Sequence, residues 1–171
     1  MRHARAILSL PGVVAVLVPA LLALTGGVDV GWGLPTAMAW LPVLAGCALA
    51  AAGVFLIGWT VSLFARVGDG TLAPWDPTAR LVVAGPYRHV RNPMIGGVLL
   101  LLLGEAALLG SRAIFIWFCS VLAVNAVYLP LVEEPGLVQR FGADYERYRA
   151  NVPRWLPRPR PWDSQHDLPN T

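Results

Sequence analysis

The chain has 171 residues, a length that fits a single domain, and its composition excludes an ordinary soluble protein. Apolar residues make up 56% of it and charged residues only 13%, whereas soluble domains carry about 25% charged residues. The composition indicates an integral membrane protein that contacts the lipid bilayer. The formal net charge of +3 is then a signal of membrane topology, and we expect no nucleic acid partner.

Four apolar stretches have the length of helices that cross a hydrocarbon core about 30 Å thick. They cover approximately residues 7–24, 36–65, 93–109 and 113–132. The predicted fold class is therefore all-α, a polytopic membrane helical bundle with about four transmembrane helices. Residues 1–160 are expected to form one domain, and residues 161–171, which are proline-rich and polar, a disordered tail.

Two polar segments complete the predicted bundle. Residues 66–91 are rich in turn-forming residues and predict an ordered cytoplasmic connector that lies against the membrane face. After the fourth stretch, Phe141, Tyr145, Tyr148 and Val152 recur three or four positions apart among arginines. This spacing predicts a C-terminal amphipathic helix, suited either to a membrane surface or to packing under a site.

The placement of the arginines predicts the orientation. They precede the first stretch, follow the second and follow the fourth, and only Arg112 lies on the other side. The positive-inside rule then puts both termini and the polar segments in the cytoplasm. The chain has no lysine, which hints at a GC-rich genome, and we expect a bacterial inner membrane.

Nearly all clustered polar residues lie in residues 85–94 (GPYRHVRNPM) and at Glu133 and Glu134. If the third and fourth stretches form an antiparallel hairpin around Gly110, Asn92 lies about 18 residues before the turn and Glu133 about 22 after it. At a rise of ~1.5 Å per residue, these two positions differ in depth by only roughly 6 Å. The hairpin would bring a helix start, several arginines and a carboxylate pair to one membrane face.

This arrangement suits a zwitterionic ligand. Asn92 is a predicted N-cap and Pro93 a favourable first helical residue. A helix start offers unpaired amides and partial positive charge to an anion, and Arg88 and Arg91 add charge. The carboxylate pair opposite could accept hydrogen bonds from an ammonium group or from ribose hydroxyls. Alternatively, the arginines only fix topology and the glutamates only mark the interface.

The same residues resemble a known superfamily. Residues 79–94, the sequence Glu133-Glu134-Pro135 and the pattern Phe141-Gly-x-x-Tyr-x-x-Tyr-x-x-x-Val-Pro153 are similar to isoprenylcysteine carboxyl methyltransferases and phospholipid methyltransferases. The resemblance implies a helical membrane enzyme that binds S-adenosylmethionine between the connector and the last two membrane helices. By position, the implied cofactor contacts are Leu81, Val82, Tyr87, Asn92, Pro93, Met94, Ile95, Glu133 and Glu134.

The resemblance implies a lipophilic acceptor but leaves its reacting group open. Asn92 and its two successors match phospholipid N-methyltransferases, whereas isoprenylcysteine enzymes have histidine there and an arginine at Leu129. The tail after Phe141 looks more like the isoprenylcysteine branch. We expect an S-adenosylmethionine-dependent methyltransferase that acts on a lipid amine, an isoprenoid, or another small hydrophobic carboxylate or thiol. The alternatives are a membrane NADPH-dependent reductase of similar architecture and a non-enzymatic membrane scaffold.

A few other polar residues are candidates for function, although none is assigned as catalytic. His89, Asn125 and Tyr128 could contact the substrate, or could serve in structural or helix-to-helix contacts. Glu105 lies inside the third stretch near its outer end, where structural and functional roles are both open. We expect no metal site, because His89 has no second ligand nearby and the two cysteines, which we expect to be buried, form no ligand pattern.

Overall fold

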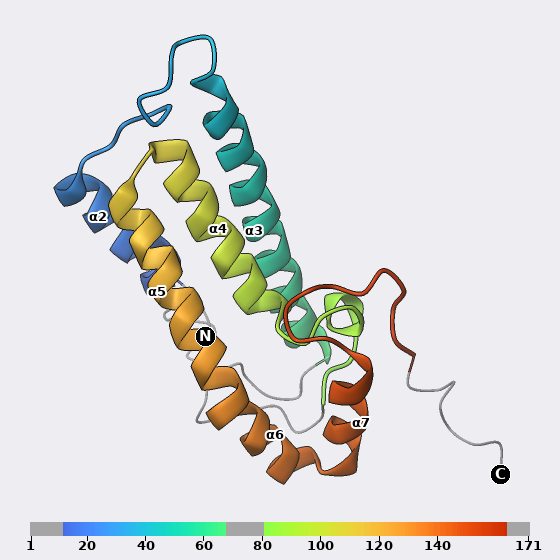
Figure 1. Cartoon of the computed structure of the whole chain (residues 1–171). Coiled ribbons are helices and arrows are strands. Elements are labelled where there is room, and N and C mark those ends of the chain that lie inside the picture. The colour runs from blue at the N-terminus through green and yellow to red at the C-terminus, as the bar shows by residue number, and fades with distance from the viewer. Residues whose placement is uncertain (1–11, 68–80, 164–171) are drawn as a thin grey trace.

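The computed structural model describes residues 12–67 and 81–163, and every regular element in these ranges is helical (Figure 1). The predicted all-α fold class is thereby confirmed. Two π turns, η1 and η3, and one 3-10 turn, η2, accompany the α-helices. In chain order the elements are η1 (Val13–Leu17), α2 (Val18–Gly26), α3 (Trp40–Val67), η2 (Gly85–Arg88), α4 (Pro93–Leu109), α5 (Arg112–Tyr128), η3 (Leu129–Glu133), α6 (Glu134–Phe141) and α7 (Ala143–Asn151).

The four predicted apolar stretches correspond to helices of two lengths. Helix α3 contains an apolar segment from Trp40 to Leu63, and α5, η3 and α6 form one from Arg112 to Phe141; both could span a membrane. The helices Val13–Gly26 and Pro93–Leu109 are apolar but shorter. Helix α4 has both of its predicted bounds. The start of the first stretch lies outside the described residues, and the number of spans stays a prediction.

Helices α3 and α4 lie side by side along their lengths (Figure 1) and approach most closely at glycines. A Cβ atom added to Gly53 would lie 2.6 Å from the carbonyl oxygen of Gly97. One added to Gly104 would lie 2.5 Å from the backbone nitrogen of Ala50. Small residues let membrane helices pack backbone against backbone. Gly46 and Gly53 therefore lie on the face of α3 that holds α4.

The N-terminal helix packs near α4 and α5 through a small core. Leu102 and Ala106 of α4 have no exposed surface, and Ala15 of η1 packs in the same region. The π turn leaves the Val14 carbonyl without a helical donor, because the matching residue is Pro19, which has no N–H. Trp117 of α5 supplies the donor, with its indole nitrogen 2.9 Å from that carbonyl. The hydrogen bond at this π turn thus links η1 to α5.

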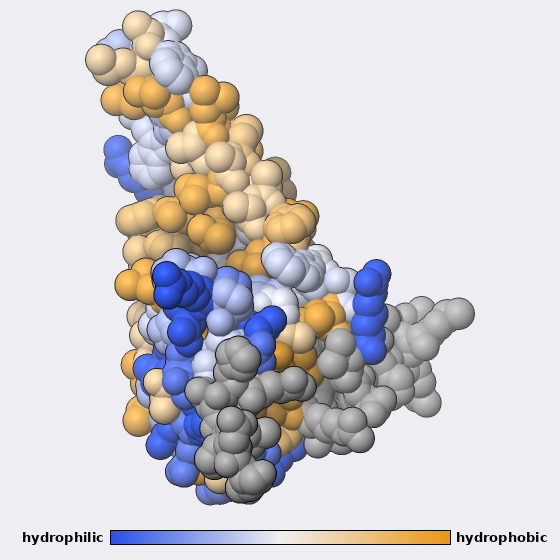
Figure 2. Space-filling view, turned by 90° about the vertical axis from the view of Figure 1, so that its right-hand side faces the viewer, coloured by the Kyte–Doolittle hydropathy of each residue, from blue (hydrophilic) through white to orange (hydrophobic). Residues whose placement is uncertain are grey.

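Much of the bundle surface is apolar. Phe55 on α3 and Ile116 and Val124 on α5 each expose more than 60% of their area. Figure 2 shows hydrophobic side chains over the body of the molecule and hydrophilic ones gathered at its lower end. A polypeptide surface of this kind is stable in contact with lipid. Cys47 and Cys119 lie exposed on it, which corrects the expectation that they are buried.

The C-terminal part differs from the single amphipathic helix that was predicted. Two short helices, α6 and α7, meet at Gly142, whose φ of 55° breaks the helix. Tyr145, Tyr148 and Val152 are buried and pack with Trp162, so this segment packs under the connector. We call residues 152–163 the C-terminal strap. Residues 161–163 were predicted to belong to a disordered tail, but Trp162 packs in this cluster. Residues 164–171 lie outside the described part of the chain, and the division into domain and tail stays a prediction.

Candidate functional site

The connector and the C-terminal strap run beside one another at the lower end of α3 and α4 (Figure 1). Both segments come from polar stretches of the sequence, yet their backbones are paired. The backbone hydrogen bonds are Arg91 N–H to the Pro153 carbonyl (2.9 Å), Arg158 N–H to the His89 carbonyl (3.0 Å) and Trp162 N–H to the Arg88 carbonyl (2.9 Å). The order predicted for the connector is thus confirmed in residues 81–91, its cytoplasmic location stays a prediction, and residues 68–80 lie outside the described ranges.

An aromatic cluster supports these two segments from below. The Tyr148 hydroxyl donates to the Tyr87 carbonyl at 2.8 Å, and Leu81 packs against the same cluster. Burial raises the pKa of the Tyr148 phenol far above its usual value. Burial, and then the nearby Glu133 carboxylate, likewise raise the pKa of the Tyr87 phenol. Both phenols are therefore neutral, and Glu133 lies within electrostatic reach of the connector.

Glu134 joins three parts of the chain through its carboxylate, which is only 8% exposed. Arg154 of the strap donates from Nε to Oε1 at 2.6 Å and from its second guanidinium nitrogen to Oε2 at 2.9 Å. Arg91, directly before the start of α4, lies 3.1 Å from Oε1. We call these three residues the Glu134 latch. Because it links α6 to the start of α4, the predicted proximity of the helix start and the glutamate pair is confirmed.

The two adjacent glutamates differ in their surroundings. Both oxygens of Glu134 are taken by guanidinium groups, whereas no ion pair involves Glu133 in the described part of the chain. Glu133 is half-buried, and its carboxylate is close enough to Tyr87 to raise the pKa of that phenol. Of the pair, Glu133 is therefore the one whose carboxylate has no guanidinium partner among the described residues. The partner of Arg154 could not be predicted from the sequence, because this contact crosses the break at Gly142.

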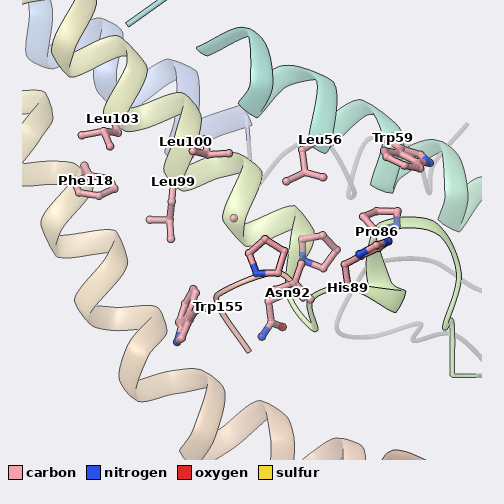
Figure 3. A pocket seen from close by; sticks show the side chains of 14 residues that line it. Leu56, Trp59, Pro86, His89, Asn92, Leu99, Leu100, Leu103, Phe118 and Trp155 are labelled. Carbon is pink, nitrogen blue, oxygen red and sulfur yellow. The ribbon is translucent and has the colours of Figure 1, made fainter. Parts of the chain in front are cut away.

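A cavity of about 650 Å³ lies next to the latch, between the helices and the strap. Some of its lining residues come from the connector, the first turn of α4 and the strap, and the others include leucines and a phenylalanine of the helical bundle (Figure 3). Almost the whole lining is apolar. The lining residues are Leu56, Trp59, Pro86, His89, Val90, Asn92, Pro93, Gly96, Leu99, Leu100, Leu103, Phe118, Trp155 and Pro157.

Asn92 is positioned by the start of α4 but does not cap it through its side chain. The Asn92 carbonyl accepts the first helical bond, from Gly96 at 3.0 Å, and Pro93 follows as expected. The predicted side-chain cap is absent at this helix start. Since Pro93 has no N–H, the orphan donors of the first turn begin at Met94 and Ile95. The Asn92 amide instead lines the cavity (Figure 3).

The predicted site residues fall into two groups in the structure. Asn92, Pro93 and His89 line the cavity. Val82 is buried, Asn125 donates to the Val121 carbonyl of its own helix, and Tyr128 is exposed. None of the remaining predicted contacts lines the cavity either, and their roles stay predictions: Leu81, Tyr87, Met94, Ile95, Glu133 and Glu134. The sequence did not single out the lining residues Trp59, Phe118 and Trp155, which only the packing brings together.

Glu105 lies toward the opposite end of α4. One of its carboxylate oxygens is buried and has no hydrogen-bond partner among the described residues. Glu105 is not among the residues that line the cavity. Its role stays open.

The fold and the site define a helical membrane protein with an apolar cavity at its polar, arginine-rich end. We call this end the polar cover; it consists of the connector, α6, α7 and the C-terminal strap. The phospholipid methyltransferase family matches residues 41–144, more than half of the chain, and the chain belongs to this family. The protein-S-isoprenylcysteine O-methyltransferase of Schizosaccharomyces pombe is 38% identical over 77 residues, which are 45% of this chain and 33% of the relative. The match thus spans about a third of that relative. No solved structure is significantly similar to the chain.

Proposed function

We propose that the protein is an S-adenosylmethionine-dependent methyltransferase that acts on a lipophilic acceptor at the membrane. The observation that carries the proposal is the cavity of about 650 Å³, which connects the polar helix start at Asn92 with the apolar interior near Phe118. Pockets of this size hold small molecules and cofactors. A polar and an apolar reactant would meet where these two surroundings join.

The residues at the cover have the chemistry that this cofactor requires. The amides of Met94 and Ile95, at the start of α4, suit the carboxylate of its amino-acid group. Glu133 suits its ammonium group or ribose hydroxyls, since the other glutamate is engaged by Arg91 and Arg154. When bound, the cofactor supplies a methyl group on a positively charged sulfur. The residues of this chain would hold the two reactants together and keep water out.

The part of the cavity that is lined by helices α4 and α5 suits the hydrophobic portion of an acceptor. Leu99, Leu103 and Phe118 form apolar walls there. From Asn92 to Leu103 the cavity follows α4 over eleven residues, about 16 Å at 1.5 Å per residue. A chain of that length would leave its reacting group beside His89 and Asn92. A lipid or isoprenoid-like acceptor could enter from the bilayer, while the cofactor would enter from the aqueous side.

We further propose that the polar cover faces the cytoplasm of a bacterial cell. The described arginines of the connector, α6, α7 and the strap all lie at this end, and only Arg112 lies at the other. This asymmetry is what the positive-inside rule predicts for cytoplasmic segments. Cytoplasmic S-adenosylmethionine would then reach the site directly.

Ligand titration tests the proposed function against its rivals. Purified protein in detergent or nanodiscs is titrated by calorimetry with S-adenosylhomocysteine and, separately, with NADPH. We expect binding of S-adenosylhomocysteine and none of NADPH. The reverse result would support the reductase instead, and binding of neither would support a scaffold. Lipid extracts of cells with and without the protein, compared by mass spectrometry for an added methyl group, then identify the acceptor.

A further inference from the structure

His89 is held in one orientation at the wall of the cavity. Its Nδ1 lies 2.8 Å from the Arg158 carbonyl, and the Arg158 N–H donates to the His89 carbonyl at 3.0 Å. Because a carbonyl only accepts hydrogen bonds, Nδ1 of the neutral ring must carry the proton. The lone pair is then on Nε2, and no hydrogen bond to Nε2 occurs among the described residues. The strap thus sets the tautomer of a cavity-lining histidine.

The other polar groups of the cavity wall cannot take this proton. They are the amide of Asn92 and the indole N–H groups of Trp59 and Trp155, which are not bases near neutral pH. The nearby arginines are already engaged, Arg91 and Arg154 by Glu134. Among the described lining residues, His89 therefore has the sole side chain able to accept a proton from a bound molecule.

We propose, on the basis of the proposed function, that His89 is the general base of the methyl transfer and that the acceptor is a lipophile with a proton-bearing nucleophile. The nucleophile, a hydroxyl, thiol or ammonium group, gives its proton to Nε2 of His89. A bond forms from the nucleophile to the methyl carbon, and the methyl–sulfur bond breaks with its electron pair remaining on sulfur. The products are the methylated acceptor and S-adenosylhomocysteine, and the imidazolium returns its proton to water.

This assignment narrows the acceptor. A carboxylate carries no proton at neutral pH and needs no base, so a site built for it gains nothing from His89. A carboxylate acceptor would also have no cationic partner in the cavity, since no arginine is among the described lining residues. A hydroxyl, thiol or ammonium group, by contrast, becomes a good nucleophile only when its proton leaves. General base catalysis of this kind contributes about 10²- to 10⁴-fold in rate.

The test uses four acceptors of matched chain length and two variants. Para-octylphenol, octanethiol and octylamine carry a dissociable proton, and octanoate does not. His89→Gln keeps an N–H donor for the Arg158 carbonyl but has no basic nitrogen, and His89→Ala opens space for added imidazole. Ser120→Ala, on the exposed face of α5, is the control. The measurements are kcat with radiolabelled S-adenosylmethionine and the affinity for S-adenosylhomocysteine.

We expect the wild type and the Ser120→Ala control to methylate at least one proton-bearing probe faster than octanoate. Both His89 variants should lose about 100-fold or more in kcat. Their affinity for S-adenosylhomocysteine should stay within about twofold of wild type. Added imidazole should raise the kcat of His89→Ala at least about tenfold, which would not happen if His89 had only a structural role.

Unchanged rates in the variants, a loss that imidazole does not repair, or methylation of octanoate in preference to the other probes would each overturn the assignment. Binding of S-adenosylhomocysteine without methylation of any proton-bearing probe would overturn the acceptor class. Failure of the wild type to bind S-adenosylhomocysteine would instead overturn the proposed function, and this inference with it.

Discussion

At the scale of single residues, Glu133 and Glu134 have the same chemistry but different surroundings. Glu134 is almost fully buried and receives three contacts from Arg91 and Arg154. Removing one partner of a buried ion pair leaves the other charge uncompensated, which costs more than the pair itself contributes. Glu133 has no ion pair in the described part of the chain and is more exposed. Two neighbours of identical chemistry should therefore respond differently to the same substitution.

Substitution of each glutamate by glutamine tests this difference. Glu134→Gln should destabilise the protein by about 2 kcal/mol or more, because the charges of Arg91 and Arg154 lose their counter-ion. Glu133→Gln should leave stability within about 0.5 kcal/mol. It should weaken S-adenosylhomocysteine binding at least tenfold, about 1.4 kcal/mol. Thermal unfolding in detergent measures the first effect and calorimetry the second; equal loss of stability in both variants would contradict this expectation.

Residue identity alone predicted the polar end of the site but not its internal contacts. Asn92, Pro93 and the glutamates could be placed at one membrane face, because the distances to the turn at Gly110 are nearly equal. The pairing of Arg154 with Glu134 could not, since it depends on how α7 folds back after Gly142. Asn92 is the N-cap residue of α4, as predicted, but its side chain makes no capping hydrogen bond.

At the scale of elements, α3 and α4 act as one unit because glycines remove the space between them. The backbones meet at Gly53 and Gly97 and again at Gly46 and Gly104. Leu56 and Trp59, on the same helix as Gly53, line the cavity, so the helix contact also sets the width of the site.

Element positions were largely predictable, since apolar length and the signals at Asn92 and Gly110 define helices. The break at Gly142 was missed because the spacing of the aromatic residues continues across it.

Two glycine substitutions on α3 test the contact. A Cβ in Gly53→Ala would lie 2.6 Å from α4 backbone atoms, so the helices must move apart; we expect a loss of about 1–3 kcal/mol. In Gly58→Ala the new Cβ has nothing within 4 Å, and helix propensity makes this change neutral or stabilising by up to about 1 kcal/mol. Unfolding in detergent compares the two. Equal stability of the variants would rule out the close contact.

At the scale of the whole molecule, an apolar body carries a polar cover at one end (Figure 2). The composition predicts a membrane protein, and the family match agrees with it. The cavity was beyond sequence reasoning, because its lining comes from α3, α4, α5, the connector and the C-terminal strap. Only the packed bundle brings Trp59, Phe118 and Trp155 to one space.

Cysteine accessibility tests the proposed orientation. In a variant with Cys47 and Cys119 replaced by serine, new cysteines are placed at Val30, in the loop before α3, or at Asp144, in α7; both positions are exposed. A membrane-impermeant maleimide should label Val30→Cys in intact cells, and Asp144→Cys only after lysis, because the positive-inside rule puts the arginine-rich end inside. The opposite labelling pattern would place the site on the outer side.

The backbone pairing between the connector and the strap also sets an order of assembly. Trp155 and Pro157 complete the cavity wall, and along the sequence they follow all the apolar helices that the structure describes. During synthesis the ribosome delivers the membrane-embedded helices first and this last wall afterwards. The helices can therefore settle in the bilayer before the cavity has its full wall, and the wall is complete only once the C-terminal strap has been synthesised and has docked.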